Sequence, residues 1–228
     1  MIGVALSVVL PFHNQADDLA QIVADHTDAL ARFPGAVQLV LVPNGSCDDT
    51  APICRRIAAG RDDMKVVELA HGGWGAAVRA GLSAADGALL CYTNSARTEP
   101  GQLLLMALYA HAYPNVVIKA NRRVRDNLRR RIGSLLYNIE CRLLFDLSTW
   151  DINGTPKVFP RAFDRLLGAQ SDDDLYDAEF VAICSRAGYP IVEIPILATV
   201  RRGGTSTTTY GSAYRMYRGA LALRRRMR

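Results

Sequence analysis

Residues 6–14 read LSVVLPFHN and residues 37–50 read VQLVLVPNGSCDDT, and these two stretches decide the fold. Each begins with a continuous apolar run, rich in β-branched residues, which is typical of a strand buried on both faces of a parallel sheet. Between them, residues 15–32 carry apolar side chains at helical spacing, so they supply the crossover that parallel strands need. Both runs end in polar, turn-forming residues. In an open α/β sheet, ligands bind at this edge, beyond the carboxyl ends of the strands.

The alternation of strands and helices continues along the chain. Further strands are expected at residues 64–69, 88–92 and 115–119, each preceded by a helix. Beyond residue 120 the sequence predicts a basic amphipathic helix over residues 121–145, shorter helices from about 160 and 175, and a last strand at 191–196. The pattern predicts an α/β fold in a single domain, residues 1–228, with a doubly wound, mostly parallel sheet and flanking helices.

Composition excludes several classes of protein. The chain of 228 residues is long enough to bury a core without disulfides, and its five cysteines (47, 54, 91, 141 and 184) show neither C-x-x-C pairs nor metal-ligand spacing. We expect them to be small buried side chains in a reducing cytosol. No signal peptide is expected, because residues 1–5 lack a basic segment. The later apolar runs are far shorter than the roughly 20 residues that span a membrane.

The net charge of +5 is unevenly distributed. Residues 119–131 hold seven Lys/Arg and one Asp, and residues 201–228 hold eight Arg and no acid. The rest of the chain holds twelve basic and twenty-one acidic residues. Both basic segments are therefore expected to bind phosphate groups or an anionic membrane surface. Nucleic acid is not expected as a partner, because the aromatic residues there are not arranged to stack on bases.

Several motifs resemble one known family. The two opening motifs of the family 2 inverting glycosyltransferases, which have the GT-A fold, are matched by Pro11, His13, Asn14, Asn44-Gly45-Ser46 and Asp48-Asp49-Thr50. Further along, GGWGAAVRAGL, DINGTPKVF, GYPIVEIPI and RRGGTS resemble the polyprenyl-phosphate branch, which includes the dolichol-phosphate mannosyltransferases. The resemblance covers nearly the whole chain. It implies a nucleotide-sugar-binding half at residues 1–120 and an acceptor half at residues 121–228.

For the donor, the resemblance implies contacts from the ends of the first strands. Asn44 stands where the family usually has an Asp that hydrogen-bonds the base, and an amide can also pair with a base edge; the same residue fits a plain Asn-Gly turn. Pro11 and Asn14 would flank the base, although Asn14 fits a helix cap as well. Backbone near Gly75, in the Gly-rich turn, would approach the nucleotide. Arg79, one helical turn further on, either contacts the donor or forms a surface ion pair.

One departure from the family lies at the end of the fourth strand. The family's Asp-x-Asp holds the divalent cation that bridges the donor diphosphate, and here Thr93, Asn94 and Ser95 replace it. Hydroxyl and amide groups are poor substitutes for carboxylates around Mg²⁺ or Mn²⁺, so no metal ligand is assigned. Arg97 brings a guanidinium, which pairs well with phosphate, to the same place. These four residues are expected to contact the donor diphosphate without a metal, or else the chain has lost donor activation.

The acceptor-phosphate candidates match the family's R-x-x-R-D and R-x-x-x-S run and its R-x-x-G-x-S loop: Arg122, Arg125, Arg130, Ser134, Arg201 and Ser206. Arg122, Asp126, Arg130 and Ser134 recur every four residues, and Arg125 stands next to Asp126, so a helix over residues 121–145 would place several of them on one side. The alternative is a solvated basic face. The loop with Arg201 closes over donor and acceptor in the family, which makes Arg201 a catalytic candidate as well.

Two carboxylates complete the predicted site. Asp151 matches the acid of the family's D-x-x-G segment, and it would orient the donor sugar or an arginine at the reaction centre. Glu179 lies in a stretch that resembles the acceptor-side helix. It is either a catalytic residue or the anchor of a neighbouring arginine.

These features predict a glycosyltransferase that moves a sugar, with inversion, from a nucleotide-sugar donor to a polyprenyl phosphate or another lipid-linked acceptor. We expect it in the cytoplasm, peripheral at the inner face of the membrane, because residues 212–228 mix Tyr, Met and Leu with arginines as an interfacial helix does. Two alternatives stay open. One is a glycosyltransferase-fold protein that binds nucleotide or lipid without turnover, and the other is a soluble transferase acting on a small-molecule hydroxyl.

Overall fold

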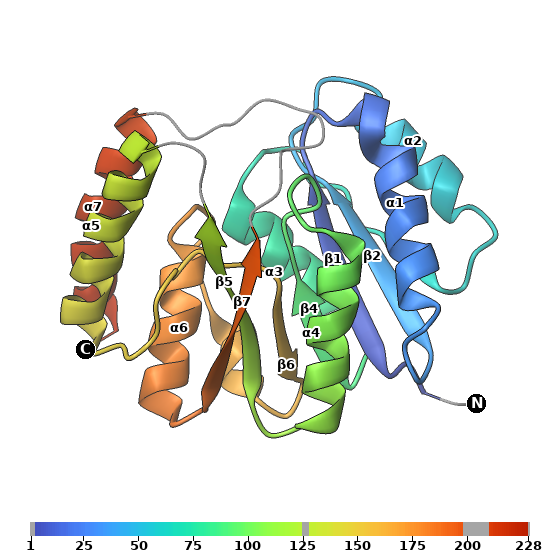
Figure 1. Cartoon of the computed structure of the whole chain (residues 1–228). Coiled ribbons are helices and arrows are strands. Elements are labelled where there is room, and N and C mark those ends of the chain that lie inside the picture. Colours follow the sequence, from blue (N-terminus) through green and yellow to red (C-terminus); the bar gives the residue numbers. More distant parts are fainter. Residues whose placement is uncertain (1–2, 125–127, 198–209, 228) are drawn as a thin grey trace.

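The computed structural model describes residues 3–124, 128–197 and 210–227, which form one seven-stranded sheet flanked by helices (Figure 1). The strands are β1 (Leu6–Phe12), β2 (Val37–Pro43), β3 (Met64–Val66), β4 (Leu89–Tyr92), β5 (Val117–Val124), β6 (Lys157–Pro160) and β7 (Ile191–Leu197). The helices are α1 (Ala16–Leu30), α2 (Thr50–Ala58), α3 (Trp74–Ala84), α4 (Pro100–Ala112), α5 (Leu128–Phe145), the 3₁₀ helix η1 (Asp164–Gly168), α6 (Tyr176–Ala187) and α7 (Tyr210–Arg226). The predicted α/β class is confirmed.

The strand order brings the predicted ligand-binding edge together. The order is β3-β2-β1-β4-β6-β5-β7, and the pairing is parallel except at β6, which runs antiparallel to both β4 and β5. β1 and β2 pair in register from Leu6 with Val37 to Phe12 with Pro43, while β4 pairs with the other side of β1. The polar loops that follow β1, β2 and β4 therefore meet at one edge of the sheet.

Both faces of the sheet are buried, which explains why β1 reads as a continuous apolar run. Successive side chains point to opposite faces. Val9 belongs to the core that includes residues of α3 and α6, and Val8 and Leu10 belong to the core that includes residues of α1 and α4. Four cysteines are buried, as predicted, whereas Cys47 is exposed.

β5 corrects the predicted organisation of the second half. The strand runs to Val124, rather than ending at residue 119, because its pairing with β7 continues past a bulge after Arg122. The helix α5 begins only at Leu128. Arg122 therefore lies on a strand, and the prediction that it shares a helix face with Ser134 is wrong. The strand also crosses residue 120, so one sheet spans the two predicted halves.

The helices α5 and α7 lie side by side at one end of the molecule (Figure 1). The rings of Tyr137 and Tyr217 meet edge to face, with centroids 5.8 Å apart. Large apolar side chains nevertheless remain exposed on this pair: Leu135, Leu136, Ile139 and Leu143 on α5, and Leu221 on α7. No helix in the described part of the chain has both the length and the apolar character needed to cross a membrane.

Candidate functional site

The loops that follow β1 and β2 are hydrogen-bonded to each other at the carboxyl edge of the sheet. The side-chain oxygen of Asn14 accepts the backbone N–H of Cys47 at 2.9 Å, and Ser46 Oγ accepts the N–H of Asn14 at 3.1 Å. Asn14 has a φ of +49°, a conformation that asparagine tolerates better than most residues. Asn14 therefore joins the two loops, and its predicted place beside a nucleotide base stays a prediction.

Asn44 follows β2 and is almost completely buried. Its side-chain amide donates to the carbonyl oxygens of Phe12 at 2.8 Å and Val42 at 3.2 Å, and its side-chain oxygen accepts the N–H of Gly73 at 3.4 Å. The amide thus ties the ends of β1 and β2 to the Gly-rich turn. A nucleotide base would compete with these contacts for the Asn44 side chain, and the predicted base contact remains untested.

The Gly-rich turn closely approaches another part of the backbone. A Cβ atom on Gly75 would collide with the carbonyl oxygen of Ser171. Arg79, one turn further along α3, forms an ion pair with Asp172 and donates to a carbonyl of the same segment at 3.1 Å. Glycine is therefore required at position 75 by the neighbouring segment, and the Arg79 ion pair agrees with the alternative that the sequence left open.

The residues that replace the Asp-x-Asp form a closed turn after β4. The hydroxyl oxygens of Thr93 and Thr98 are 2.5 Å apart, and Ser95 Oγ donates to the carbonyl of Pro11 at 2.7 Å. Thr93 and Ser95 are both almost completely buried. Pro11 therefore holds this turn through its carbonyl, and both hydroxyl groups are used inside the protein.

This turn does not fit a divalent cation. It offers hydroxyl groups that are already hydrogen-bonded, and no cluster of three or more His, Cys, Asp or Glu side chains suited to a metal ion occurs in residues 3–124, 128–197 and 210–227. Asn94 and Arg97 are only partly buried, and the N–H of Arg97 donates to the carbonyl of Asn94 at 3.0 Å. The predicted contacts of Asn94 and Arg97 with the donor diphosphate stay predictions.

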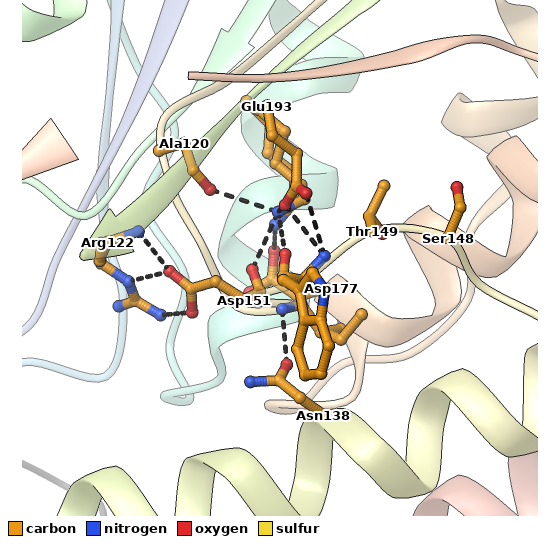
Figure 2. A network of polar contacts seen from close by, with 12 residues as sticks. Ala120, Arg122, Asn138, Ser148, Thr149, Asp151, Asp177 and Glu193 are labelled. Carbon is orange, nitrogen blue, oxygen red and sulfur yellow. Dashed lines mark hydrogen bonds and ion pairs between the residues drawn. The ribbon is translucent and has the colours of Figure 1, made fainter. Parts of the chain in front are cut away.

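Arg122 on β5 and Asp151 on the loop after α5 form a bidentate ion pair (Figure 2). Arg122 Nε and Nη2 donate to the two carboxylate oxygens at 2.8 and 2.7 Å, and its backbone N–H donates at 2.9 Å. Burial acts to lower the pKa of Arg122, but the hydrogen bonds and charge of Asp151 raise it above its usual value. The Arg122 side chain is 25% exposed, so part of it stays accessible. Of the two roles expected for Asp151, the structure shows the pairing with an arginine, and contact with the donor sugar stays a prediction.

Lys119 and Glu193 are paired residues on the adjacent strands β5 and β7, and sequence reasoning missed both. Lys119 Nζ lies 2.7 Å from Glu193 Oε1 and donates to the carbonyls of Trp150 at 2.5 Å and Asp151 at 3.1 Å. Burial lowers the pKa of Lys119, and the Glu193 charge opposes this shift. The only signal in the sequence was one charged residue inside each of two apolar runs, VVIKA and IVEIPI.

A second buried polar group is centred on Asp177, in the first turn of α6. Its carboxylate accepts Trp74 Nε1 at 3.0 Å and Tyr92 Oη at 2.9 Å, and it pairs with Lys157 of β6. One carboxylate thus joins α3, β4, β6 and α6. Burial lowers the pKa of Lys157 to about 8, although Asp177 opposes the shift. Sequence reasoning chose Glu179, two residues further on, and missed this group.

Glu179 makes contacts of a different kind. One oxygen accepts the N–H groups of Gln170 at 3.1 Å and Ser171 at 2.7 Å, and the other lies 3.0 Å from Arg226 Nη2 of α7. These contacts agree with the alternative that Glu179 anchors a neighbouring arginine. Its catalytic role stays a prediction.

Four acceptor-phosphate candidates are not placed by the structure: Arg125, Arg201 and Ser206 lie outside the described residues, as does the side chain of Arg130. Ser134 is partly buried on α5, where its hydroxyl accepts a bond of 3.4 Å from Asn138. The Asn138 oxygen in turn accepts the N–H of Ile152 at 2.8 Å, next to Asp151. The helix α5 therefore contacts the loop that carries Asp151.

Residues 7–167 match the family model described as glycosyl transferase family 2. The chain belongs to this family. An uncharacterized glycosyltransferase of Mycobacterium tuberculosis is 27% identical over 210 residues, which cover 90% of each chain. The undecaprenyl-phosphate 4-deoxy-4-formamido-L-arabinose transferase of Klebsiella pneumoniae is 24% identical over 211 residues, which cover 90% of this chain and 63% of that protein.

This family 2 glycosyltransferase also resembles solved structures. The crystal structure of glucosyl-3-phosphoglycerate synthase from Mycobacterium tuberculosis, in complex with Mn²⁺, UDP-glucose and phosphoglyceric acid, covers 97% of this chain with a TM-score of 0.66. The matched region covers 78% of the synthase chain, at 19% sequence identity. Such a likeness shows the shared GT-A fold alone. The family, in turn, makes the chain a transferase.

The first testable prediction concerns the buried Lys157–Asp177 pair. Lys157→Met should lower the free energy of unfolding at pH 7 by about 3–5 kcal/mol, because it leaves the Asp177 charge buried without its cation. Between pH 8 and pH 10 the parent should gain stability relative to this variant. The folded protein releases the Lys157 proton near pH 8, whereas the unfolded chain holds it to about 10.4.

Urea unfolding of the parent and the variant at pH 7, 8 and 10 measures both effects. Lys65→Met is the matched control, since it removes a lysine from a half-exposed pair with Asp86 and should cost less than about 1 kcal/mol. A fall in the parent's relative stability from pH 8 to pH 10 would contradict the lowered pKa of Lys157.

Proposed function

We propose that this glycosyltransferase transfers a sugar, with inversion, from a nucleotide-sugar donor to a polyprenyl phosphate at the inner face of an anionic membrane. The observation that carries the proposal is the bidentate pair of Arg122 and Asp151 near the carboxyl edge of the sheet. A guanidinium whose plane is held by a carboxylate is well suited to bind a phosphate with its remaining donors. The named activity of the undecaprenyl-phosphate relative supports a lipid phosphate as acceptor.

The proposed reaction needs no general base. An oxygen of the acceptor phosphate attacks the anomeric carbon of the sugar from the face opposite the leaving group. The bond from that carbon to the donor diphosphate breaks, and the nucleoside diphosphate leaves with the bonding electrons. Because a phosphate monoester is already ionised at neutral pH, the protein has only to place two anionic groups and stabilise their charge. In this scheme Arg122 contacts the acceptor and Arg97 contacts the donor diphosphate.

A binding protein without turnover is the second candidate. The closed turn after β4 favours it, because the hydroxyls of Thr93 and Ser95 are bonded within the protein and no carboxylate replaces the family's acid pair. Such a protein would bind nucleotide or lipid and give no transfer in any assay with a complete set of substrates. Transfer to a complete set of substrates therefore separates the two candidates.

The membrane part of the proposal rests on the helices α5 and α7. Exposed leucines on α5, of which Leu143 is 81% exposed, lie on the helix that packs beside α7. The last turn of α7 carries Arg224, Arg225 and Arg226. Apolar side chains beside a cluster of arginines are typical of a surface that inserts shallowly into anionic lipid.

The second testable prediction concerns metal. Donor binding should persist in a chelator, because the turn at residues 93–95 has no carboxylate to hold a divalent ion. Arg97→Ala should weaken donor binding by about 1 to 3 kcal/mol, the contribution of one charge-assisted contact. Calorimetric titration with UDP-glucose and other nucleotide sugars, with and without chelator, provides the measurement. Loss of binding in chelator together with unchanged binding by Arg97→Ala would refute this view of the donor site.

The third prediction concerns the membrane surface. Changing Arg224 and Arg225 to Glu should lower binding to vesicles of phosphatidylglycerol and phosphatidylcholine by at least about tenfold, since each basic residue near such a surface contributes about 1 kcal/mol. Arg226 is left unchanged because it pairs with Glu179.

The matched control changes the exposed Arg56 and Arg165 to Glu, which alters the net charge by the same amount elsewhere on the protein. Binding measured by vesicle co-sedimentation should also fall as salt rises, because the attraction is screened. Equal binding to vesicles of phosphatidylcholine alone, or an equal loss in the control, would overturn the membrane assignment.

The fourth prediction separates a phosphate acceptor from a hydroxyl acceptor. Arg122→Ala, Arg130→Ala and Arg201→Ala should each lower transfer to a short polyprenyl phosphate by about ten- to a hundredfold, the loss of a hydrogen bond to a charged group. Glu179→Gln should have a smaller effect. A hydroxyl acceptor would instead need a positioned carboxylate base, whose removal costs about 10² to 10⁴ in rate.

The measurement is the transfer rate between pH 6 and pH 9, with Arg55→Ala, which removes an exposed pair with Glu68, as the control. Abolished transfer in Glu179→Gln or Asp151→Asn, a matching basic limb in the parent's pH profile, and mild losses in the arginine variants would favour the hydroxyl acceptor.

A further inference from the structure

Residues 148–152, which carry Asp151, are held by side chains from three other elements. Arg142 of α5 donates to the carbonyls of Ser148 at 3.0 Å and Thr149 at 3.2 Å. The side-chain oxygen of Asn138, also on α5, accepts the N–H of Ile152 at 2.8 Å. Lys119 of β5 and Glu193 of β7 bind the backbone of Trp150 and Asp151. The central part of this segment therefore depends on two charged side chains that lie on neighbouring strands.

The contacts of Lys119 converge on the peptide groups next to Asp151. Its ammonium donates to the carbonyls of Trp150 at 2.5 Å, Asp151 at 3.1 Å and Ala120 at 3.3 Å. Both oxygens of Glu193 accept the N–H of Trp150 at 3.1 Å, and one of them pairs with Lys119 at 2.7 Å. The N–H and the carbonyl of Trp150 are thus held by two opposite charges, Glu193 and Lys119, which also pair with each other.

Asp151 itself has an unusual backbone conformation. Its φ is +47°, in the left-handed region that residues other than glycine rarely adopt. Such a conformation persists where the surroundings hold it in place, and it concentrates at functional sites. The contacts of Lys119 and Glu193 supply that restraint. In this conformation the Asp151 carboxylate meets the guanidinium of Arg122 with two parallel hydrogen bonds (Figure 2).

We propose that Lys119 and Glu193 are positioning residues for sugar transfer. They hold the peptide between Trp150 and Asp151 so that Asp151 fixes the plane of the Arg122 guanidinium, which then receives the acceptor phosphate. The catalytic meaning of this inference rests on the proposed function, whereas the restraint on Arg122 does not. The side chain of Lys119 is wholly buried, so it does not touch substrate, and Glu193, which is 21% exposed, acts through its contacts with Lys119 and Trp150.

The choice of a charged pair at this place supports a positioning role. A buried ion pair is a poor source of stability, because an apolar pair of similar volume often serves the fold as well or better. An apolar pair, however, has no donor for the Trp150 and Asp151 carbonyls and no acceptor for the Trp150 N–H. Lys119 and Glu193 therefore fix the orientation of the Trp150–Asp151 peptide, and through the Asp151 carboxylate they fix the orientation of the Arg122 guanidinium.

The experiment first measures the restraint itself, without any substrate. In ¹⁵N-labelled protein, exchange of the Arg122 Nε–H with water reports its bond to Asp151, and the signal is assigned by its loss in Arg122→Lys. Lys119→Met should speed this exchange by at least about tenfold, because local opening of the pair becomes easier. Glu193→Gln, which keeps an acceptor for Trp150, should give a smaller increase. Lys65→Met, the control, should leave the exchange unchanged.

The variant Glu193→Gln decides the question by itself if Lys119→Met fails to fold. Unchanged Arg122 exchange in the folded variants would overturn the proposal. A protein that shows the expected exchange changes but no transfer with any donor and polyprenyl phosphate would sink the proposed function and leave the restraint on Arg122 established.

The second measurement is transfer to a short polyprenyl phosphate. Lys119→Met should lower the rate by about 10²-fold, the typical effect of misplacing a reacting group by about 1 Å. The double variant Lys119→Met/Asp151→Asn should be no slower than Asp151→Asn alone, because both changes act through Arg122. A residue with a merely structural role would give losses that multiply, and that result would also overturn the proposal.

Discussion

The pairing of three cations with three carboxylates, buried or partly buried near one edge of the sheet, is the constraint on which the second half of the molecule depends. The three cations are Lys119, Arg122 and Lys157, and the three carboxylates are Asp151, Asp177 and Glu193. A charge removed from water is tolerated only where a partner stands at a fixed place. Because these partners lie on β5, β6, β7, α6 and the loop after α5, none of those elements can shift without leaving a charge unpaired. The polar contacts set the relative positions that apolar packing alone would leave adjustable.

Local pattern predicted the first half of the fold well and the second half less well, for a physical reason. The strands β1 and β2 are buried on both faces, so their continuous apolar sequences were enough to predict them. The end of β5 is different. Its arginine-rich sequence resembles a basic helix, and only pairing with β7, about seventy residues further along the chain, keeps Arg122 in a strand. Likewise, Asp177 and Glu179 both lie in the first turn of α6, and the rotation of that helix against Lys157 decides which carboxylate is buried against β6.

The residue types in the family motifs predicted the positions of the loops better than they predicted the contacts of single side chains. Asn44, Gly75 and Ser95 stand in motifs that predict contact with a nucleotide, yet their described contacts are with other parts of the protein: strand ends, a neighbouring backbone segment and the Pro11 carbonyl. These interactions shape the loops at the carboxyl edge. Asp151 is the case where motif and structure agree most closely, because its carboxylate was expected to orient the donor sugar or an arginine, and it pairs with Arg122. In this protein, the motif residues hold the loops of the carboxyl edge in place, and the motif alone does not tell which group each side chain contacts.

In the proposed metal-free donor site, arginine side chains take the place of a divalent cation. Where a divalent cation neutralises a diphosphate, the cation arrives with the substrate, and the empty site holds carboxylates. A site that relies on arginine carries its positive charge permanently, so that charge has to be balanced while no anion is bound. Among the predicted contact residues, Arg79 is paired with Asp172 and Arg122 with Asp151 in this structure. Pairing lets the chain keep its cations in place while no anion is bound, and a bidentate partner such as Asp151 does so without using every donor of the guanidinium.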